Sequence, residues 1–214
     1  MMRDIAVIFL IITLIGSQSR IPHLDGLCNC TNSYECAQKL EKYQLNRYKN
    51  FVIRQSDRLL LKLDNGGQLT LEDIDKEGNE TELYTFRELL ENLNIYVIQI
   101  HYYEGGEYML INKNSGEKIK IVGKIKVSPD KQRLVSYNVD LEAHYCPNGF
   151  QIIRLLNDHF VEEYQLIIDE WGPSNVKWIS NTKLEFEKIG WQDAGLKIIG
   201  KVRYIYRNNK WIGQ

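Results

Sequence analysis

The stretch SYNVDLEAHYCPNGF, residues 136–150, concentrates side chains that could do chemistry. It carries Asp140, Glu142, His144 and Cys146 at every second position. On a β-strand, alternate side chains share a face, so these four would line one side of the strand. Two carboxylates and an imidazole on one face could hold a divalent cation or run acid–base catalysis. On this interpretation, Asp140, Glu142 and His144 serve a metal-dependent hydrolase or metal-binding enzyme.

A structural interpretation explains the same stretch with fewer assumptions, and we favour it. A half-buried strand is polar outward and apolar inward, which is the alternation seen from Val139 to Tyr145. Pro147, Asn148 and Gly149 would then form the turn into the next strand. Nothing nearby in the sequence supplies a further ligand or a nucleophile–base pair. We therefore expect a non-catalytic binding or interaction protein without a cofactor.

Two tryptophans are the better candidates for contact with a ligand. Trp171, in DEWGPSN, and Trp191, in IGWQDAG, are expected in loops, where binding residues concentrate. Aromatic rings can stack on sugar or peptide, so the predicted partner is a protein or a carbohydrate. The predicted binding surface combines these two loops with Asp140, Glu142 and His144. Core packing is the alternative for both rings.

The charge balance of the chain argues against a nucleic-acid partner. The 214 residues include 27 Lys and Arg against 28 Asp and Glu, which leaves a net charge of -1. Binding to the phosphate backbone needs a basic surface that neutralises several phosphates. The sequence also contains none of the glycine-rich phosphate loops or the zinc-protease helix motif.

The first 19 residues predict export. Arg3 precedes an apolar run from Ile5 to Ile15, and small polar residues follow at 17–19. This order is typical of a cleaved signal peptide, and the run is shorter than the roughly 20 residues that span a bilayer. We expect a secreted or periplasmic protein whose mature chain has no membrane span. An uncleaved anchor is the alternative.

Export favours disulfides among the four cysteines. Cys28, Cys30 and Cys36 lie close together, and Cys146 is remote. Cys28 and Cys30 are too close to pair easily, so Cys36 is expected to bridge to one of them, and the other could reach Cys146. A zinc site is the alternative, but the C-x-C-x5-C spacing differs from the usual paired zinc pattern.

Two helices are expected from local patterns. Residues 33–50 place apolar side chains near one face, and Ser33 can cap the helix. Residues 85–93 offer Thr85 as a cap with Glu88 three positions later, which is the spacing of a capping box.

The remainder of the chain reads as mainly β. Four hairpins are expected where turn-forming residues separate alternating runs. The turns are Asn65-Gly66-Gly67, Asn114-Ser115-Gly116, Asn157-Asp158 and Asn208-Asn209. Two-strand units at 124–138 and 175–189 precede the last two hairpins, which makes four-stranded meanders. We expect three regions: the signal peptide at 1–19, a cysteine-containing lead-in and helix at 20–50, and one β-rich domain at 51–214.

The meanders resemble the blades of WD40-like and TolB-like β-propellers. The resemblance rests on VSPDKQRLVSYNVD followed by GFQIIRL, and it covers Lys124 to Gln214. Lys131 stands where those families usually have glycine. The resemblance implies a small propeller-like array of at most about four blades, fewer than most propellers have. An open twisted sheet or a sandwich of similar meanders is the alternative.

Overall fold

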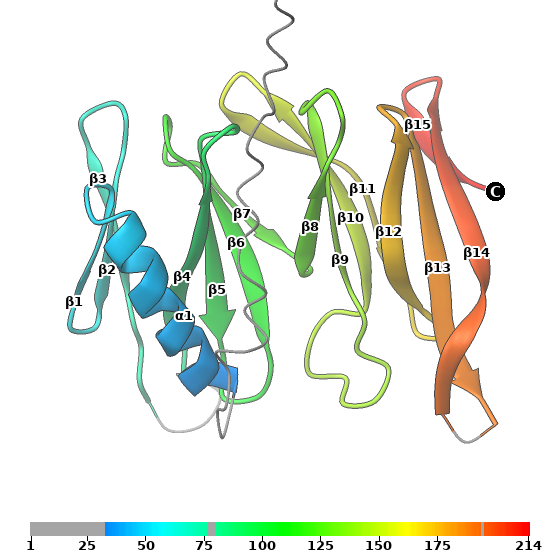
Figure 1. Cartoon of the computed structure of the whole chain (residues 1–214), viewed down its shortest axis with the longest axis horizontal. Coiled ribbons are helices and arrows are strands. Elements are labelled where there is room, and N and C mark those ends of the chain that lie inside the picture. The colour runs from blue at the N-terminus through cyan, green and yellow to red at the C-terminus, as the bar shows by residue number, and fades with distance from the viewer. Residues whose placement is uncertain (1–32, 77–79, 194) are drawn as a thin grey trace, which may run out of the picture.

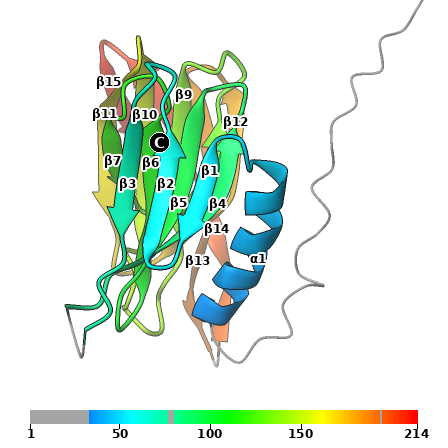
Figure 2. The same ribbon diagram turned by 90° about the vertical axis from the view of Figure 1, so that its left-hand side faces the viewer.

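The computed structural model describes residues 33–76, 80–193 and 195–214. The predicted signal peptide, as well as Cys28 and Cys30, lies outside these ranges. The first element is α1, Ser33–Arg47, which agrees with the predicted helix. It lies alongside the sheets and packs against β1 and β4 (Figure 2). In the described ranges, no helix has the length and apolar character needed to cross a membrane.

Within the described residues, fifteen strands form four antiparallel sheets (Figure 1). In chain order, the first sheet contains β1 Val52–Gln55, β2 Arg58–Lys62 and β3 Gln68–Glu72; the second contains β4 Leu83–Leu90, β5 Ile95–His101, β6 Gly106–Asn112 and β7 Lys118–Ile121; the third contains β8 Lys124–Val127, β9 Arg133–Asn138, β10 Gly149–Leu156 and β11 His159–Ile167; and the fourth contains β12 Gly172–Ser180, β13 Lys183–Gln192, β14 Gly195–Arg207 and β15 Lys210–Gly213. Each strand pairs with its neighbours in the sequence, so every sheet is a meander. The predicted mainly β fold of repeated meanders is confirmed.

The four predicted hairpins are also confirmed, as β2–β3, β6–β7, β10–β11 and β14–β15. Two of them turn on consecutive residues with positive φ. Asn157 and Asp158 have φ of 46° and 68°, and Asn208 and Asn209 have φ of 50° and 60°. These angles belong to the two-residue turns whose twist matches that of the flanking strands.

The helix predicted at residues 85–93 is wrong, because this segment forms β4 and the turn after it. Thr85 pairs with Gln99 on β5 and bonds a neighbouring imidazole instead of capping a helix. A β-bulge after Phe86 places Phe86 and Leu89 in the same core. Long-range pairing therefore overrides the local capping-box pattern.

The cores of the protein lie between successive sheets. One apolar cluster joins the first two sheets and α1, a second joins the middle two sheets, and a third joins the last two sheets. Figure 1 shows the first and the last sheet at opposite ends of the row. The sheets therefore form an open row, with one face of each end sheet free of a neighbouring sheet.

One arginine fastens the first sheet, the second sheet and α1 together. Arg54 on β1 bonds Glu41 of α1 at 2.8 Å and Asp73 at 3.1 Å, and it also donates to the carbonyl oxygen of Tyr84 on β4. Glu41 accepts a further bond of 2.7 Å from the backbone N–H of Phe86. All three charged side chains are largely buried, so each depends on the others for compensation.

We predict that Arg54→Ala lowers the free energy of unfolding by about 3–5 kcal/mol, because it leaves two buried carboxylates without their cation. Arg58→Ala is the matched control, since Arg58 and Glu72 form an exposed pair on the adjacent strands. Its loss should cost less than about 1 kcal/mol. Urea unfolding followed by tryptophan fluorescence measures both variants. Equal effects of the two substitutions would contradict this account of the cluster.

Candidate functional site

The predicted strand through Asp140, Glu142, His144 and Cys146 is wrong. Strand β9 ends at Asn138 and β10 begins at Gly149, and the residues between them form a loop. The side chain of Asp140 organises this loop. Its Oδ1 accepts the backbone N–H groups of residues 143 and 144, each at 3.1 Å, and its Oδ2 accepts those of residues 145 and 146, each at 2.8 Å.

This geometry gives no support to a metal site at Asp140. Both oxygens of its carboxylate already accept two N–H donors, whereas Glu142 and His144 are exposed. The part of the chain that the structure describes holds no cluster of three or more His, Cys, Asp or Glu side chains arranged for a metal ion. Partial burial raises the pKa of Asp140, but the four N–H bonds outweigh it, so the pKa lies below its usual value.

The structure brings both predicted tryptophans to this loop. The indole Nε1 of Trp191 donates to the carbonyl oxygen of Leu141 at 3.4 Å. The side chain of Asn148 donates to the carbonyl oxygen of Trp171 at 3.0 Å. The ammonium of Lys188 lies 4.8 Å from the centre of the Trp171 ring. Residues that are 23 to 50 positions apart in sequence thus meet at one end of the molecule.

Two further aromatic side chains belong to the same end. Tyr145 projects from the β9–β10 loop and is 56% exposed, and Tyr103 projects from the β5–β6 loop and is 67% exposed. The two loops touch: a β-carbon on Gly105 would lie 2.2 Å from the carbonyl oxygen of Tyr145. The placement of Tyr145 on the buried face of a strand is wrong, because Tyr145 lies in a loop and is exposed. We call Tyr103, Tyr145, Trp171 and Trp191 the loop-end surface.

The connections β5–β6, β9–β10 and β13–β14 explain this gathering. Each joins the second and third strands of its sheet, and the sheets stand side by side in chain order (Figure 1). Equivalent connections of successive antiparallel meanders therefore emerge at the same end. The loop predicted for Trp191 is wrong, because Trp191 is the next-to-last residue of β13, where it is 56% exposed. Trp171 does lie outside the strands, in the connection from β11 to β12, and is half-buried.

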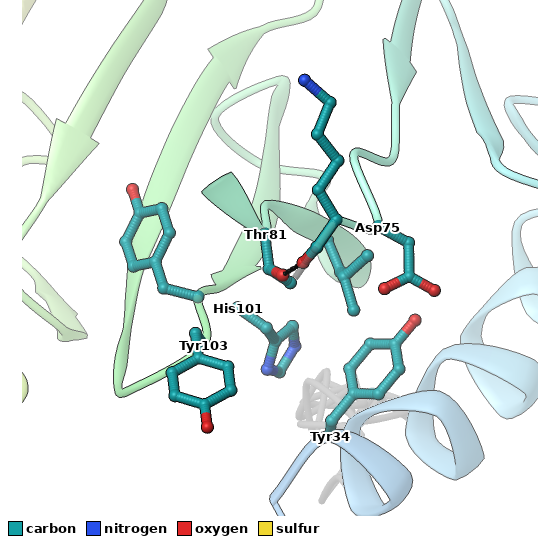
Figure 3. Close-up of a pocket in the computed structure, with 8 residues that line it drawn as sticks. Tyr34, Asp75, Thr81, His101 and Tyr103 are labelled. Carbon is teal, nitrogen blue, oxygen red and sulfur yellow. Dashed lines mark hydrogen bonds between the residues drawn. The ribbon is translucent and has the colours of Figure 1, made fainter. Parts of the chain in front are cut away.

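A pocket of about 780 Å³ opens at the start of α1, beside Tyr103 (Figure 3). Its lining comes from α1, from the connection between β3 and β4, from the start of β4, and from β5 with the loop that follows. The lining residues are Tyr34, Asp75, Lys76, Thr81, Leu83, His101, Tyr102 and Tyr103. In Figure 3 the rings of Tyr34, His101 and Tyr103 gather at the centre of the pocket, with the carboxylate of Asp75 above Tyr34.

His101 is a packed, neutral imidazole. It is 4% exposed, its Nε2 lies 2.9 Å from Oγ1 of Thr85, and its ring makes an edge contact with Tyr34 at 4.9 Å. Burial lowers the pKa of His101 to about 4, with a smaller contribution from the positive charge of Arg87. An imidazole that stays uncharged at neutral pH serves here as a hydrogen-bonded wall of the pocket.

The predicted bridge to Cys146 is not formed, because Cys146 carries a free thiol. The loop places this residue beside Gly105 and Gly106 of the second sheet, where it lines a smaller cavity. Burial raises the pKa of the Cys146 thiol. Cys36 lies in the first turns of α1, and the pairing predicted for it involves residues outside the described ranges, so that pairing stays a prediction.

Comparisons with known proteins add little to this geometry. No protein-family model matches the sequence, and no curated protein matches it. Among solved structures, the N-terminal domain of Nup159 is similar over 77% of this chain, with 10% sequence identity and a TM-score of 0.32. The similar region spans 46% of the solved chain of that domain. Similarity at this level carries no argument about function, so the site must be judged on its own contacts.

We predict that Asp140→Ala loosens the β9–β10 loop. Loss of charge-assisted hydrogen bonds should cost about 1.5–3 kcal/mol and speed hydrogen exchange at the amides of residues 143–146. Glu142→Ala, which changes an exposed carboxylate two positions away, is the control and should leave exchange unchanged. In the unsubstituted protein the bonds persist above the unfolded-state pKa of about 3.9 and fail as the pH falls through the lower native pKa. Equal exchange rates in the two variants would show that Asp140 does not stabilise the β9–β10 loop.

Titration of His101 gives a second prediction. The native pKa of about 4 lies below the unfolded value of about 6.5, so only the unfolded state gains this proton between the two values. The stability that His101 contributes is therefore complete above about pH 6.5 and declines towards pH 4. Urea unfolding across this range should show a shallower pH dependence for His101→Gln than for the unsubstituted protein. Parallel pH profiles would show that the imidazole is not held neutral.

Proposed function

We propose that this protein is an exported, non-catalytic binding module that holds its partner on the loop-end surface. One observation carries the proposal. Four aromatic side chains lie at one end of the row of sheets, and contacts between their segments hold them there. They are Tyr103 on the β5–β6 loop, Tyr145 on the β9–β10 loop, Trp171 on the β11–β12 connection and Trp191 at the end of β13. The bonds from Trp191 to Leu141 and from Asn148 to Trp171 join the third and fourth sheets there.

The exposure of these rings supports a role in binding. Tyr103, Tyr145 and Trp191 are each more than half exposed, although burial of a ring is strongly favourable. Tyrosine and tryptophan are also the residues that most often dominate the energy of protein interfaces, because they bring a large contact area with little loss of conformational freedom. A partner that covers these rings would remove their apolar surface from water, which favours binding.

The expected partner is a protein or a carbohydrate, since either offers apolar faces that stack on aromatic rings. The neighbouring pocket supports this, because it can receive a group that projects from the partner beside Tyr103. Its lining combines rings with the carboxylate of Asp75 and the hydroxyl group of Thr81. The charged start and apolar run of residues 1–19 support a secreted or periplasmic location.

The test compares two triple variants of the mature chain, residues 20–214. Tyr103→Ala/Tyr145→Ala/Trp191→Ala removes the exposed rings of the loop-end surface. Leu156→Ala/Val161→Ala/Ile179→Ala removes three exposed apolar side chains outside this surface. Each is immobilised beside the unsubstituted chain and exposed to a glycan array and to extracellular proteins from the source organism, with bound proteins identified by mass spectrometry.

We expect a ligand of the unsubstituted chain to bind the ring-deleted variant at least about tenfold more weakly, because central aromatic residues each contribute about 2 kcal/mol or more to an interface. The control variant should bind that ligand normally. Circular dichroism verifies that both variants are folded. A ligand that binds all three chains equally would refute the loop-end surface as the binding site.

A further inference from the structure

The fourth sheet differs in charge from the rest of the chain. Residues 172–214 contain eight of the 27 Lys and Arg residues but three of the 28 Asp and Glu residues. The sheet therefore carries a net charge of +5 within a chain whose net charge is -1. The net charge of the whole chain does not show this separation, because the acidic surplus elsewhere cancels it. A local surplus of this size produces a field that favours anionic surfaces.

This sheet stands at the end of the open row, so one of its faces has no sheet packed on it (Figure 1). Leu184, Phe186 and Tyr204 point inward and belong to the core shared with the third sheet. Residues between them on β13 and β14 point to the other side, because side chains alternate along a strand. We call this side the end face.

The strand register defines the end face. Glu185 lies opposite Lys177 on one side and Arg203 on the other, and Glu187 lies opposite Lys201. A second row joins Lys183, Ile205 and Ile212, and Arg207 lies opposite Lys210 at the β14–β15 turn. The face is therefore a band of charged residues beside an aliphatic pair, Ile205 and Ile212, that is bordered by further cations. Ile212 is 49% exposed.

The acids of the end face are already paired, whereas several of its cations are not. Glu185 bonds Arg203 at 2.8 Å, and Glu187 lies 3.6 Å from Lys201. Within the described ranges, five cations of this sheet form no salt bridge. Lys188 lies against the ring of Trp171, and the other four lie on the end face: Lys177, Lys183, Arg207 and Lys210. The surplus charge is thus concentrated around the aliphatic pair, in which Ile205 is half-buried and Ile212 is exposed, and it is available to a partner.

We propose that the end face binds an acidic protein segment, whose apolar side chains cover Ile205 and Ile212 and whose carboxylates meet Lys177, Lys183 and Lys210. Charge complementarity selects this occupant. A second copy docked through the same face would bring like charges together, which disfavours association. A second copy docked through the outer face of its first sheet is also disfavoured. That face presents Arg58 and Lys62 beside a single carboxylate, Glu72, so it too would bring cations against the end face.

The end face is separate from the loop-end surface. Its aliphatic pair and its unpaired cations lie towards the β14–β15 turn, whereas Trp191 lies towards the β13–β14 turn, at the other end of β13. The protein therefore offers two binding surfaces, one aromatic and one basic, and a single molecule can hold two partners at once. This inference does not depend on the proposed function of the loop-end surface.

The test uses a synthetic ten-residue peptide of alternating glutamate and leucine, with an alternating glutamine and leucine peptide as the uncharged match. Amide chemical shifts of the isotopically labelled mature chain report where each peptide binds. Lys177→Glu/Lys183→Glu reverses two unpaired charges of the end face. Lys49→Glu/Lys118→Glu makes the same change in net charge at exposed lysines outside the fourth sheet.

We expect the acidic peptide to shift end-face amides of β13, β14 and β15, and its affinity to fall about tenfold or more in Lys177→Glu/Lys183→Glu. The control variant should bind within about twofold of the unsubstituted chain, and 0.5 M salt should weaken binding because the charges are exposed. Ile212→Ala should also weaken binding, since part of the contact is aliphatic.

Four results would overturn the proposal: no end-face shifts with the acidic peptide, equal affinity for the glutamine peptide, equal affinity of the two lysine variants, or a dimer formed through this face. Duplex DNA and phosphatidylglycerol vesicles are measured alongside. If either binds the end face more tightly than the acidic peptide, the partner is a nucleic acid or a membrane and the protein-segment proposal fails. Loop-end variants should leave all these results unchanged, which separates this test from that of the proposed function.

Discussion

A meander of four strands has two faces, and the rest of this structure depends on how those faces are covered. A single sheet of this size cannot bury both faces alone, so each sheet is stabilised by its neighbour in the row. The two middle sheets have a neighbour on each side. Their central strands are accordingly apolar in long runs, as in β5, Ile95–His101, where six of seven residues are buried. The last sheet has one neighbour, and β13 alternates strictly from Lys183 to Phe186.

This constraint explains which parts of the fold could be predicted from sequence. Turns such as Asn157-Asp158 and Asn208-Asn209 are local, because their positive φ angles need only those residues, and they were predicted correctly. The segment at 85–93 failed for a reason of geometry. A β-bulge adds one residue between Phe86 and Leu89, so two core side chains are three positions apart, as on one face of a helix. The helix prediction rested on the capping-box spacing of Thr85 and Glu88. Neither that spacing nor the separation of the two core side chains distinguishes a bulged strand from a short helix.

The candidate site shows a different limit. Aspartate often bonds N–H groups a few residues ahead in its own chain, and this local bonding competes with strand formation. Asp140 accepts bonds from four such groups. The segment after β9 therefore folds into a compact loop, although its alternating polar residues are typical of a strand. The predicted residues Trp171 and Trp191 do meet that loop, but they do so through contacts between sheets. No local pattern in a single sequence specifies such contacts. Tyr145 was placed on a buried face because its segment was taken for a strand, whereas the segment forms a loop.

The contacts between the third and fourth sheets set the relative position of the two proposed binding surfaces. Arg133 on β9 bonds both oxygens of Glu163 on β11, at 2.7 and 3.0 Å, and the indole of Trp211 on β15 donates to the same carboxylate at 2.9 Å. The guanidinium also lies 4.6 Å from the ring centre of Tyr206 on β14. A buried ion pair adds little net stability, but its directional bonds admit few alternative arrangements. The same contacts therefore hold β14 and β15, which carry the end face, against the sheet whose loop carries Tyr145, so a partner on either surface meets a fixed shape.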